Sequence, residues 1–526
     1  MLFNSYVFIL LFLPITFLVY HSLRKLSTND ASIKFLVLAS IFFYGWWNYR
    51  YVALIIASIL LNFVLGLAIS KKENASIRKS FLALGITLNL AALGYFKYFN
   101  FFVENWNTLI GTEAPLFSIA LPLAISFFTF QQIAYLCDVY TGSAKEYRFT
   151  HYCLFVTFFP QLIAGPIVHH REMLPQFSQS TRFSKLLPSI TMGIAIFSIG
   201  LIKKSVLADG IAAYSTPLFN AALAGEVITF FDGWFAALSY TLQLYFDFSG
   251  YSDMAIGAAL LFGIRLPLNF NSPYRSLSII EFWRRWHITL SRFLRDYLYI
   301  PIGGNRGGSS RRYANLITTM LLGGLWHGAG WTFVAWGLLH GLYLIINHGW
   351  RNLLRYLGIH QKSSTLTRLI SWTVTFFAVV VGWVFFRAET FDAALIIISG
   401  MFGLNGIVLP EAFKTNVVTV NFIYDLAGVN FGFGGGTKFV LNVAWISTLL
   451  FIAVFFPNTQ QIMRYRPPAP DDRYSPRQKI DEVLFSSLWK KNYWKVSSAW
   501  SILIGLLTAI GILSLTSISE FLYFQF

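Results

Sequence analysis

The sequence predicts an all-α protein that crosses a membrane many times. Mean hydropathy is +0.58, and only 12% of the residues are charged, whereas soluble chains carry about 25%. Apolar runs near the length needed to cross a bilayer recur along all 526 residues, and helix is the only plausible spanning structure for runs this long. We therefore expect about ten to thirteen membrane segments.

The expected segments follow one another along the whole chain. The longer runs are Tyr6–Leu23, Tyr51–Ser70, Phe81–Phe102, Leu116–Leu136, Ile190–Leu207, Val227–Phe246, Asn315–His327, Trp331–His348, Leu369–Phe386, Val440–Phe456 and Trp500–Thr516. Four shorter runs are expected to be short spans, tilted pieces or re-entrant segments: Phe35–Trp47, Tyr152–Val168, Ala255–Phe262 and Ala393–Phe402. The first run is expected to be a retained helix, because it lacks the basic start and the cleavage site of a signal peptide.

The net charge of +17 first suggests a nucleic-acid partner, but its distribution argues against one. Basic residues cluster in short loops between apolar runs, as the positive-inside rule predicts for cytoplasmic loops. These loops are Arg24–Lys25, Lys71–Lys79, Arg182–Lys185, Arg284–Arg312, Arg351–Arg368 and Arg464–Lys495. The loops Glu104–Pro115 and Asn405–Thr437 are poor in Lys and Arg and are placed outside. Both termini are expected outside and Asp471–Lys495 inside.

The chain shows no internal repeat and no linker to a soluble domain, so a single membrane-embedded domain is expected. Its catalytic core is placed at about 240–350, an outer loop at about 405–437 and a cytoplasmic loop at about 458–497. The two cysteines, Cys137 and Cys153, are too few for a disulfide framework and lack metal-ligand spacing. We expect both to serve packing, and no metal site is expected.

Polar residues concentrate between Asp247 and Arg312. The stretch Tyr245–Asp253 reads YFDFSGYSD and ends an apolar run. Its carboxylates, Asp247 and Asp253, lie near membrane depth and are therefore candidates for function, here as substrate contacts. Each could instead cap the following helix, pair with a nearby arginine, or lie at the water interface.

The next segment, Ser278–Tyr297, has apolar residues at helical spacing and is expected to form one amphipathic helix. A second stripe holds Arg284, His287, Ser291 and Arg295. Such a basic helix with Trp and Phe can lie in the membrane interface, here on the cytoplasmic side. Anchoring explains the arginines, but it does not explain a histidine, so His287 is a candidate for chemistry.

Pro301–Arg312 reads PIGGNRGGSSRR and is a glycine-rich basic loop. It could hold phosphate, although a turn with cytoplasmic positive charges explains it equally well. It is followed by Asn315–Ala329, in which His327 ends an apolar run among the glycines at 323, 324 and 328. Those glycines permit close approach of a helix or a substrate. His340 and His348 lack this setting, and structural roles are expected for both.

The motifs together resemble the membrane-bound O-acyltransferase (MBOAT) family. The likeness is densest in YFDFSGYSDMAIG (Tyr245–Gly257), EFWRRWHITLSRFLRDYLYIPIGGNR (Glu281–Arg306) and NLITTMLLGGLWHGA (Asn315–Ala329). It extends to SFFTFQQIAYLCDVY (Ser126–Tyr140), FFPQLIAGPI (Phe158–Ile167) and PNTQQIM (Pro457–Met463). Within the family, the chain looks most like the bacterial branch that O-acetylates exported polysaccharides such as alginate.

The resemblance implies a ring of helices around a thin centre with a tunnel, and acetyl-CoA as a donor used from the cytoplasm. The essential histidine of the family falls on His327 and the second one on His287. His327 would be the general base, and His287 would orient the donor, donate to the thioester carbonyl or relay a proton. A covalent acetyl-histidine is equally open. Weaker candidate substrate contacts are Arg284, Arg285, Arg306, Asp247, Asp253 and Trp326.

The acceptor and the partners follow only from the resemblance. It implies a bacterial inner-membrane protein that hands acetyl to a periplasmic acetyltransferase, docked on the outer loop, which modifies an exported polysaccharide. Membrane lipids are the other expected partner, and no permanently bound cofactor is expected. The alternatives are acyl export for peptidoglycan O-acetylation, D-alanyl transfer to teichoic acid, and a transporter or channel without chemistry.

Overall fold

The computed structural model describes residues 1–26, 28–144, 148–178, 183–359, 364–415, 418–432, 436–468 and 493–516. In these ranges the chain is mostly helical, and the only strands are β1 (Ile407–Pro410) and β2 (Val429–Gly432). The expected all-α class is therefore confirmed. The chain forms two compact units that alternate along the sequence. The first holds residues 1–202, 248–269 and the described residues from 459 onward, and the second holds 203–247 and 270–458.

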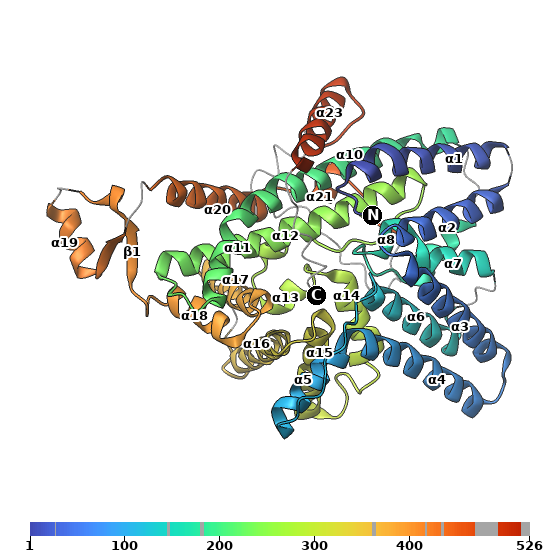
Figure 1. Ribbon diagram of the computed structural model, residues 1–526, viewed down its shortest axis with the longest axis horizontal. Coiled ribbons are helices and arrows are strands. Elements are labelled where there is room, and N and C mark those ends of the chain that lie inside the picture. Colours follow the sequence, from blue (N-terminus) through green and yellow to red (C-terminus); the bar gives the residue numbers. More distant parts are fainter. Residues whose placement is uncertain are drawn as a thin grey trace. The chain divides into compact units, whose positions relative to one another are not determined.

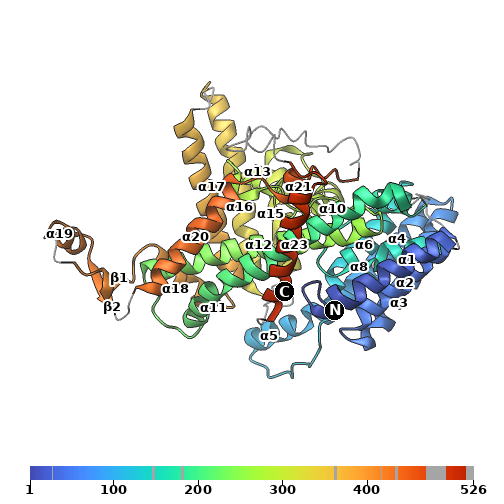
Figure 2. The ribbon, with the colours of Figure 1, turned by 90° about the horizontal axis from the view of Figure 1, so that it is seen from above.

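The first unit is a set of packed helices in which α1 to α4, α6 and α7 are neighbours (Figures 1 and 2). Its helices are α1 (Leu13–Leu26), α2 (Asn29–Gly45), α3 (Val52–Lys71), α4 (Ala75–Leu93), α5 (Phe99–Ile110), α6 (Ile125–Tyr140), α7 (Phe149–Thr157), α8 (Phe159–Leu162), α9 (His170–Phe177), α10 (Phe183–Ile202), α21 (Thr459–Met463), α23 (Ser498–Leu513) and the second half of α12 (Phe230–Leu261). Its core is rich in phenylalanine; the rings of Phe8, Phe43 and Phe159 lie within about 6 Å of one another.

The second unit carries both candidate catalytic histidines. Its helices are the first half of α12, α11 (Asp209–Leu223), α13 (Ile279–Trp283), α14 (Ile288–Leu294), α15 (Gly308–His327), α16 (Trp331–Tyr356), α17 (Thr365–Arg387), α18 (Phe391–Met401), α19 (Val418–Leu426) and α20 (Thr437–Phe455). Helices α15 and α16 form a hairpin, and α17 packs on α16 (Figure 2). A methyl group at Gly324 would lie 2.2 Å from the carbonyl oxygen of Phe333, and one at Gly337 would lie 2.4 Å from that of Met320. The glycines therefore allow the two backbones to touch.

Six helices in the described ranges are long and apolar enough to cross a membrane: Val7–Leu26, Tyr49–Lys71, Ala75–Ile110, Leu186–Leu223, Thr365–Arg387 and Thr437–Phe455. Two shorter apolar helices are Phe391–Met401 and Ser498–Leu513. The chain is thus a multi-pass membrane protein. The total of ten to thirteen segments, the ring with its tunnel and the single domain stay predictions.

Two helix boundaries differ from the expectation. The run Leu116–Leu136 is not one helix, since residues 112–122 are irregular and α6 begins only at Ile125. Pro115 and Pro122 explain the late start, because proline lacks an amide donor and disfavours helix in the residue before it. Conversely, Val227–Phe246 and Ala255–Phe262 are not separate pieces. Apart from Val227–Thr229 and Phe262, both runs belong to one continuous helix, α12, which continues through the YFDFSGYSD motif.

The expected outer loop, Asn405–Thr437, contains regular structure. Strands β1 and β2 pair in parallel, with Ile407 opposite Val429, and α19 lies between them in the sequence. Figure 1 shows this small strand–helix–strand unit around α19. The middle of the GFGGG stretch, residues 433–435, lies outside the described residues, as does most of the cytoplasmic loop Asp471–Lys495.

Candidate active site

His327 is the last residue of α15, and aromatic rings surround it. Its side chain is buried, with 7% of the residue exposed. The centroid of its ring lies 5.0 Å from that of Trp326, 5.1 Å from that of Trp336 and 5.0 Å from that of Phe386. These neighbours come from α15, α16 and α17, so three helices of the second unit fix the position of one imidazole.

His287 lies beside His327, with 6.4 Å between the two ring centroids. Its backbone has φ +40° and ψ +54°, in the left-handed region that residues other than glycine rarely adopt. The residue is 1% exposed, and burial lowers the pKa of His287 to about 3. This imidazole is therefore neutral at pH 7, the form that can accept a proton or donate its N–H.

The left-handed turn at His287 corrects the expectation of one amphipathic helix over Ser278–Tyr297. The segment consists of α13, the turn at Arg284–His287, α14 and a stretch of π-helix, Arg295–Tyr299. The apolar spacing continues across the break, and for this reason the pattern alone suggested one helix. The stripe of Arg284, His287, Ser291 and Arg295 is consequently divided, and His287 points away from the solvated face into the interior.

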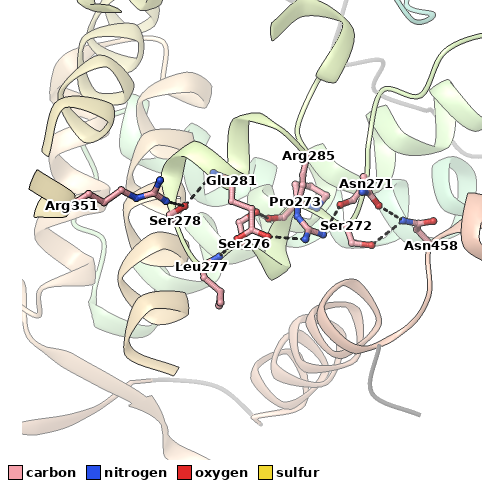
Figure 3. A network of polar contacts seen from close by, with 10 residues as sticks. All are labelled: Asn271, Ser272, Pro273, Ser276, Leu277, Ser278, Glu281, Arg285, Arg351 and Asn458. Atoms are coloured by element: carbon pink, nitrogen blue, oxygen red, sulfur yellow. Dashed lines mark hydrogen bonds and ion pairs between the residues drawn. The ribbon is translucent and has the colours of Figure 1, made fainter. Parts of the chain in front are cut away.

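A polar network holds the chain ahead of His287 in place (Figure 3). The guanidinium of Arg285 pairs with Glu281 at 2.7 Å and donates to the carbonyl oxygen of Asn271 at 3.4 Å. The amide of Asn458 donates to Oδ1 of Asn271 at 3.0 Å and to Oγ of Ser272 at 3.1 Å. These contacts tie the turn after α13 to Asn271, and Asn271 in turn to the segment that follows α20, and so they position the turn that carries His287.

The three arginine candidates differ in their surroundings. Arg284 and Arg306 are exposed, whereas the guanidinium of Arg285 is engaged in the network just described. Arg306 precedes α15 in the glycine-rich loop, where Gly303, Gly304 and Gly307 have positive φ. Asn315 donates to the carbonyl oxygen of Gly304 at 3.0 Å and so pins this turn to α15. The loop is thus a turn stabilised by its helix, and its ability to bind phosphate stays a prediction.

The two carboxylates of the YFDFSGYSD motif are both buried inside α12 and belong to different units. Asp247 forms an ion pair with Lys204, which is fully buried and also pairs with Asp209 at 2.8 Å. Asp253 lies in the first unit and accepts hydrogen bonds from Thr459 and Gln460, both at 2.6 Å. Neither lies at an end of α12, so neither caps this helix, and both are buried; Asp247 pairs with a lysine.

The sequence did not predict three of the aromatic residues that pack around the histidines, Trp336, Trp383 and Phe386. Trp336 and Trp383 stack with 5.8 Å between their ring centroids, and Phe386 meets Trp336 edge-on at 5.1 Å. They appear in the sequence as ordinary members of apolar runs, so nothing in the pattern of hydropathy marks them. Trp326, in contrast, was a candidate and does contact His327. In the described ranges no three His, Cys, Asp or Glu side chains come together as a metal site requires.

The fold and the site define an integral membrane protein with two buried imidazoles packed among aromatic rings. The sequence profile of the MBOAT, membrane-bound O-acyltransferase family, matches residues 80–386. The chain belongs to this family, and it is an O-acyltransferase.

Several relatives match most of the chain. The peptidoglycan O-acetyltransferase of Helicobacter pylori is 44% identical over 451 residues, which cover 81% of this chain and 84% of the relative. The probable alginate O-acetylase AlgI of Azotobacter vinelandii is 43% identical over 429 residues, covering 80% and 82%. That of Pseudomonas putida is 38% identical over 535 residues and covers all of both chains.

Proposed function

We propose that this O-acyltransferase takes an acetyl group from acetyl-CoA on the cytoplasmic side of the bacterial inner membrane and passes it across for O-acetylation of a polysaccharide. Relatives at 36–44% identity are named for acetyl transfer to alginate or peptidoglycan. The observation that carries the proposal is the pair His287 and His327, 6.4 Å apart between ring centroids and buried among aromatic rings.

In the proposed reaction, His327 is the general base. It takes the proton of the attacking hydroxyl, whose oxygen bonds to the thioester carbonyl carbon; the carbon–sulfur bond breaks, and the thiolate of CoA takes up the proton. A positioned base of this kind contributes about 10²- to 10⁴-fold to the rate. His287 is neutral and can donate its N–H to the thioester carbonyl. Attack by His327 itself, with acetyl-histidine as intermediate, uses the same two residues.

The aromatic rings around His327 support its role. A reaction beside these buried rings would be shielded from water, which hydrolyses the thioester, and its hydrogen bonds would be stronger than in water. The exposed Arg284 and Arg306 would meet the anionic coenzyme by charge-assisted hydrogen bonds, while Trp326 would line the acetyl position. Asp247 and Asp253, which are engaged in buried contacts, would support the helices rather than touch substrate.

The acceptor side follows from the relatives and from the outer segment around β1 and β2. We place there the docking of a periplasmic acetyltransferase that completes the modification of an exported polysaccharide. Alginate-like polysaccharide is the first candidate acceptor. Peptidoglycan is the second, and it is favoured by the 44% identity with the peptidoglycan O-acetyltransferase of H. pylori.

The test is acyl transfer by purified protein in lipid, with radiolabelled acetyl-CoA and a D-alanyl carrier protein as rival donors. Alginate and peptidoglycan are offered as rival acceptors, each with the matching periplasmic partner. The proposal predicts that, with acetyl-CoA as the sole donor, CoA is released and the label appears on one of the two glycans. Turnover only with the D-alanyl carrier protein would contradict acetyl-CoA as the donor. Transport of acetyl-CoA without covalent turnover would contradict an enzymatic function.

A further inference from the structure

His340 is a histidine whose burial the proposed reaction leaves unexplained. It lies on α16 and is fully buried, with 0% of the residue exposed. Within the described ranges, neither Nδ1 nor Nε2 of His340 has a hydrogen-bond partner. A purely structural histidine in a core normally has at least one of these nitrogens satisfied, because an unpaired buried polar group costs about 1–3 kcal/mol.

Two indole N–H groups beside His340 share this property. The ring of Trp336 lies 4.8 Å and that of Trp283 lies 5.2 Å from the imidazole, measured between centroids. Nε1 of each indole is buried and lacks a partner among the described residues. A neutral imidazole offers one donor and one acceptor, and each indole offers one donor. Three donors and one acceptor therefore gather without protein partners in one small region.

This cluster adjoins the catalytic pair. The indole of Trp336 stands between two imidazoles, 5.1 Å from His327 on one side and 4.8 Å from His340 on the other. The helix that closes the far side, α17, passes His340 at Gly382, where even a methyl group would lie 2.9 Å from Nε2. The glycine therefore brings the backbone of α17 close to this edge of the imidazole, where a larger residue would displace the ring.

We infer that His340, with the indole N–H groups of Trp283 and Trp336, forms a second hydrogen-bonding site beside His327 that holds a neutral oxygen atom of a substrate. None of the rings that contact His340 carries a full charge, so a phosphate or a carboxylate would be buried there without compensation. An excess of donors over acceptors suits a carbonyl or a hydroxyl oxygen. The inference rests on the proposed function, whose two reacting groups are the thioester carbonyl and the acceptor hydroxyl.

The test compares His340→Phe with wild-type protein in lipid, because phenylalanine keeps the ring but removes both nitrogens. If no protein hydrogen bond is lost, the melting temperature stays the same or rises. Transfer from acetyl-CoA falls at least about 10-fold, the loss expected for one buried hydrogen bond to substrate. Hydrolysis of acetyl-CoA without acceptor identifies the oxygen: it falls too if His340 holds the carbonyl, and it stays unchanged if His340 holds the hydroxyl.

His348→Phe is the matched control, since His348 lies on the same helix and is only half-buried; it should keep wild-type transfer. Wild-type transfer by His340→Phe would overturn the inference, and so would a melting temperature that falls in step with activity. If His340→Phe does not fold, Trp283→Phe decides: reduced transfer supports the site, and wild-type transfer overturns it. A failure of the proposed function is distinguishable from a failure of this inference, because in that case the wild-type protein itself transfers no acetyl group.

Discussion

At the scale of single residues, the conformation of His287 is the most informative feature. A left-handed backbone costs a residue other than glycine about 1–2 kcal/mol, and this cost persists only where the surroundings impose it. Here the network of Asn271, Glu281, Arg285 and Asn458 fixes the approach to the turn. The strained turn aims the imidazole at His327, which a regular helix over Ser278–Tyr297 would not do.

We expect His287→Asn to fold and to lose activity. Asparagine tolerates the left-handed region better than most residues, so the melting temperature should stay close to that of wild-type protein. Acetyl transfer should fall by about 10²-fold, since the amide of asparagine does not reach as far as Nε2 of histidine and cannot exchange a proton. Melting curves and label transfer measured on one preparation check this, and wild-type transfer by a folded His287→Asn variant would remove His287 from the chemistry.

The same residue predicts how stability depends on pH. The pKa of His287 is about 3 in the folded state and about 6.5 in the unfolded chain, so below pH 6.5 the unfolded state binds the proton. Stability should therefore be full above pH 6.5 and decline as the pH falls, by about 2 kcal/mol at pH 5. The difference in melting temperature between pH 7.5 and pH 5 should be larger for wild-type protein than for His287→Asn. Equal differences would show that His287 is not buried in its neutral form.

At the scale of elements, the hairpin of α15 and α16 sets the position of His327 through its glycines. Gly324 and Gly337 face each other across backbone contacts that exclude a side chain. The glycines at 323, 324 and 328 indicated close approach of a helix or a substrate, and the apolar runs predicted the two helices. The aromatic residues that α17 contributes, Trp383 and Phe386, could not be predicted as neighbours of the site. They come far later in the sequence and reach it only through tertiary packing. The break at His287 escaped prediction because the period of the apolar residues continues across it.

We expect Gly337→Ala to destabilise the hairpin and to reduce transfer. The added methyl group would lie 2.4 Å from the carbonyl oxygen of Met320, and overpacking of this kind costs about 1–3 kcal/mol. The shift would also displace Trp336 from His327. Gly349→Ala on the same helix is the control, since no atom lies within 4 Å of its added methyl group. Equal melting temperatures for the two variants would contradict the close packing of α15 on α16.

At the scale of the whole molecule, composition and the apolar runs predicted the class of protein, whereas the orientation expected from loop charge stays a prediction. The all-α class and the membrane location followed from the apolar runs alone. The boundaries of two helices did not follow from them. Prolines delayed α6, and α12 continues from the second unit into the first. Its buried carboxylates interrupt the hydropathy pattern but are compensated, Asp247 by Lys204 and Asp253 by Thr459 and Gln460.

Loop charge predicts the orientation of the chain. In a variant whose native cysteines, Cys137 and Cys153, are replaced by serine, Lys414→Cys should react with a membrane-impermeant thiol reagent in spheroplasts. Arg306→Cys should react only after the membrane is opened. Both positions are exposed, so access to the residue itself is not limiting. Reaction of Arg306→Cys in closed spheroplasts, with Lys414→Cys protected, would reverse the orientation and exclude use of cytoplasmic acetyl-CoA at this face.

The most direct test of the central claim is transfer of radiolabelled acetyl by His327→Ala beside wild-type protein, both in lipid with acetyl-CoA, the periplasmic partner and the glycan. The account predicts that the variant stays folded and inserted while transfer falls by about 10²- to 10⁴-fold, the contribution of a general base. Wild-type transfer by a folded His327→Ala variant would contradict the assignment of the base and leave His287 as the remaining candidate.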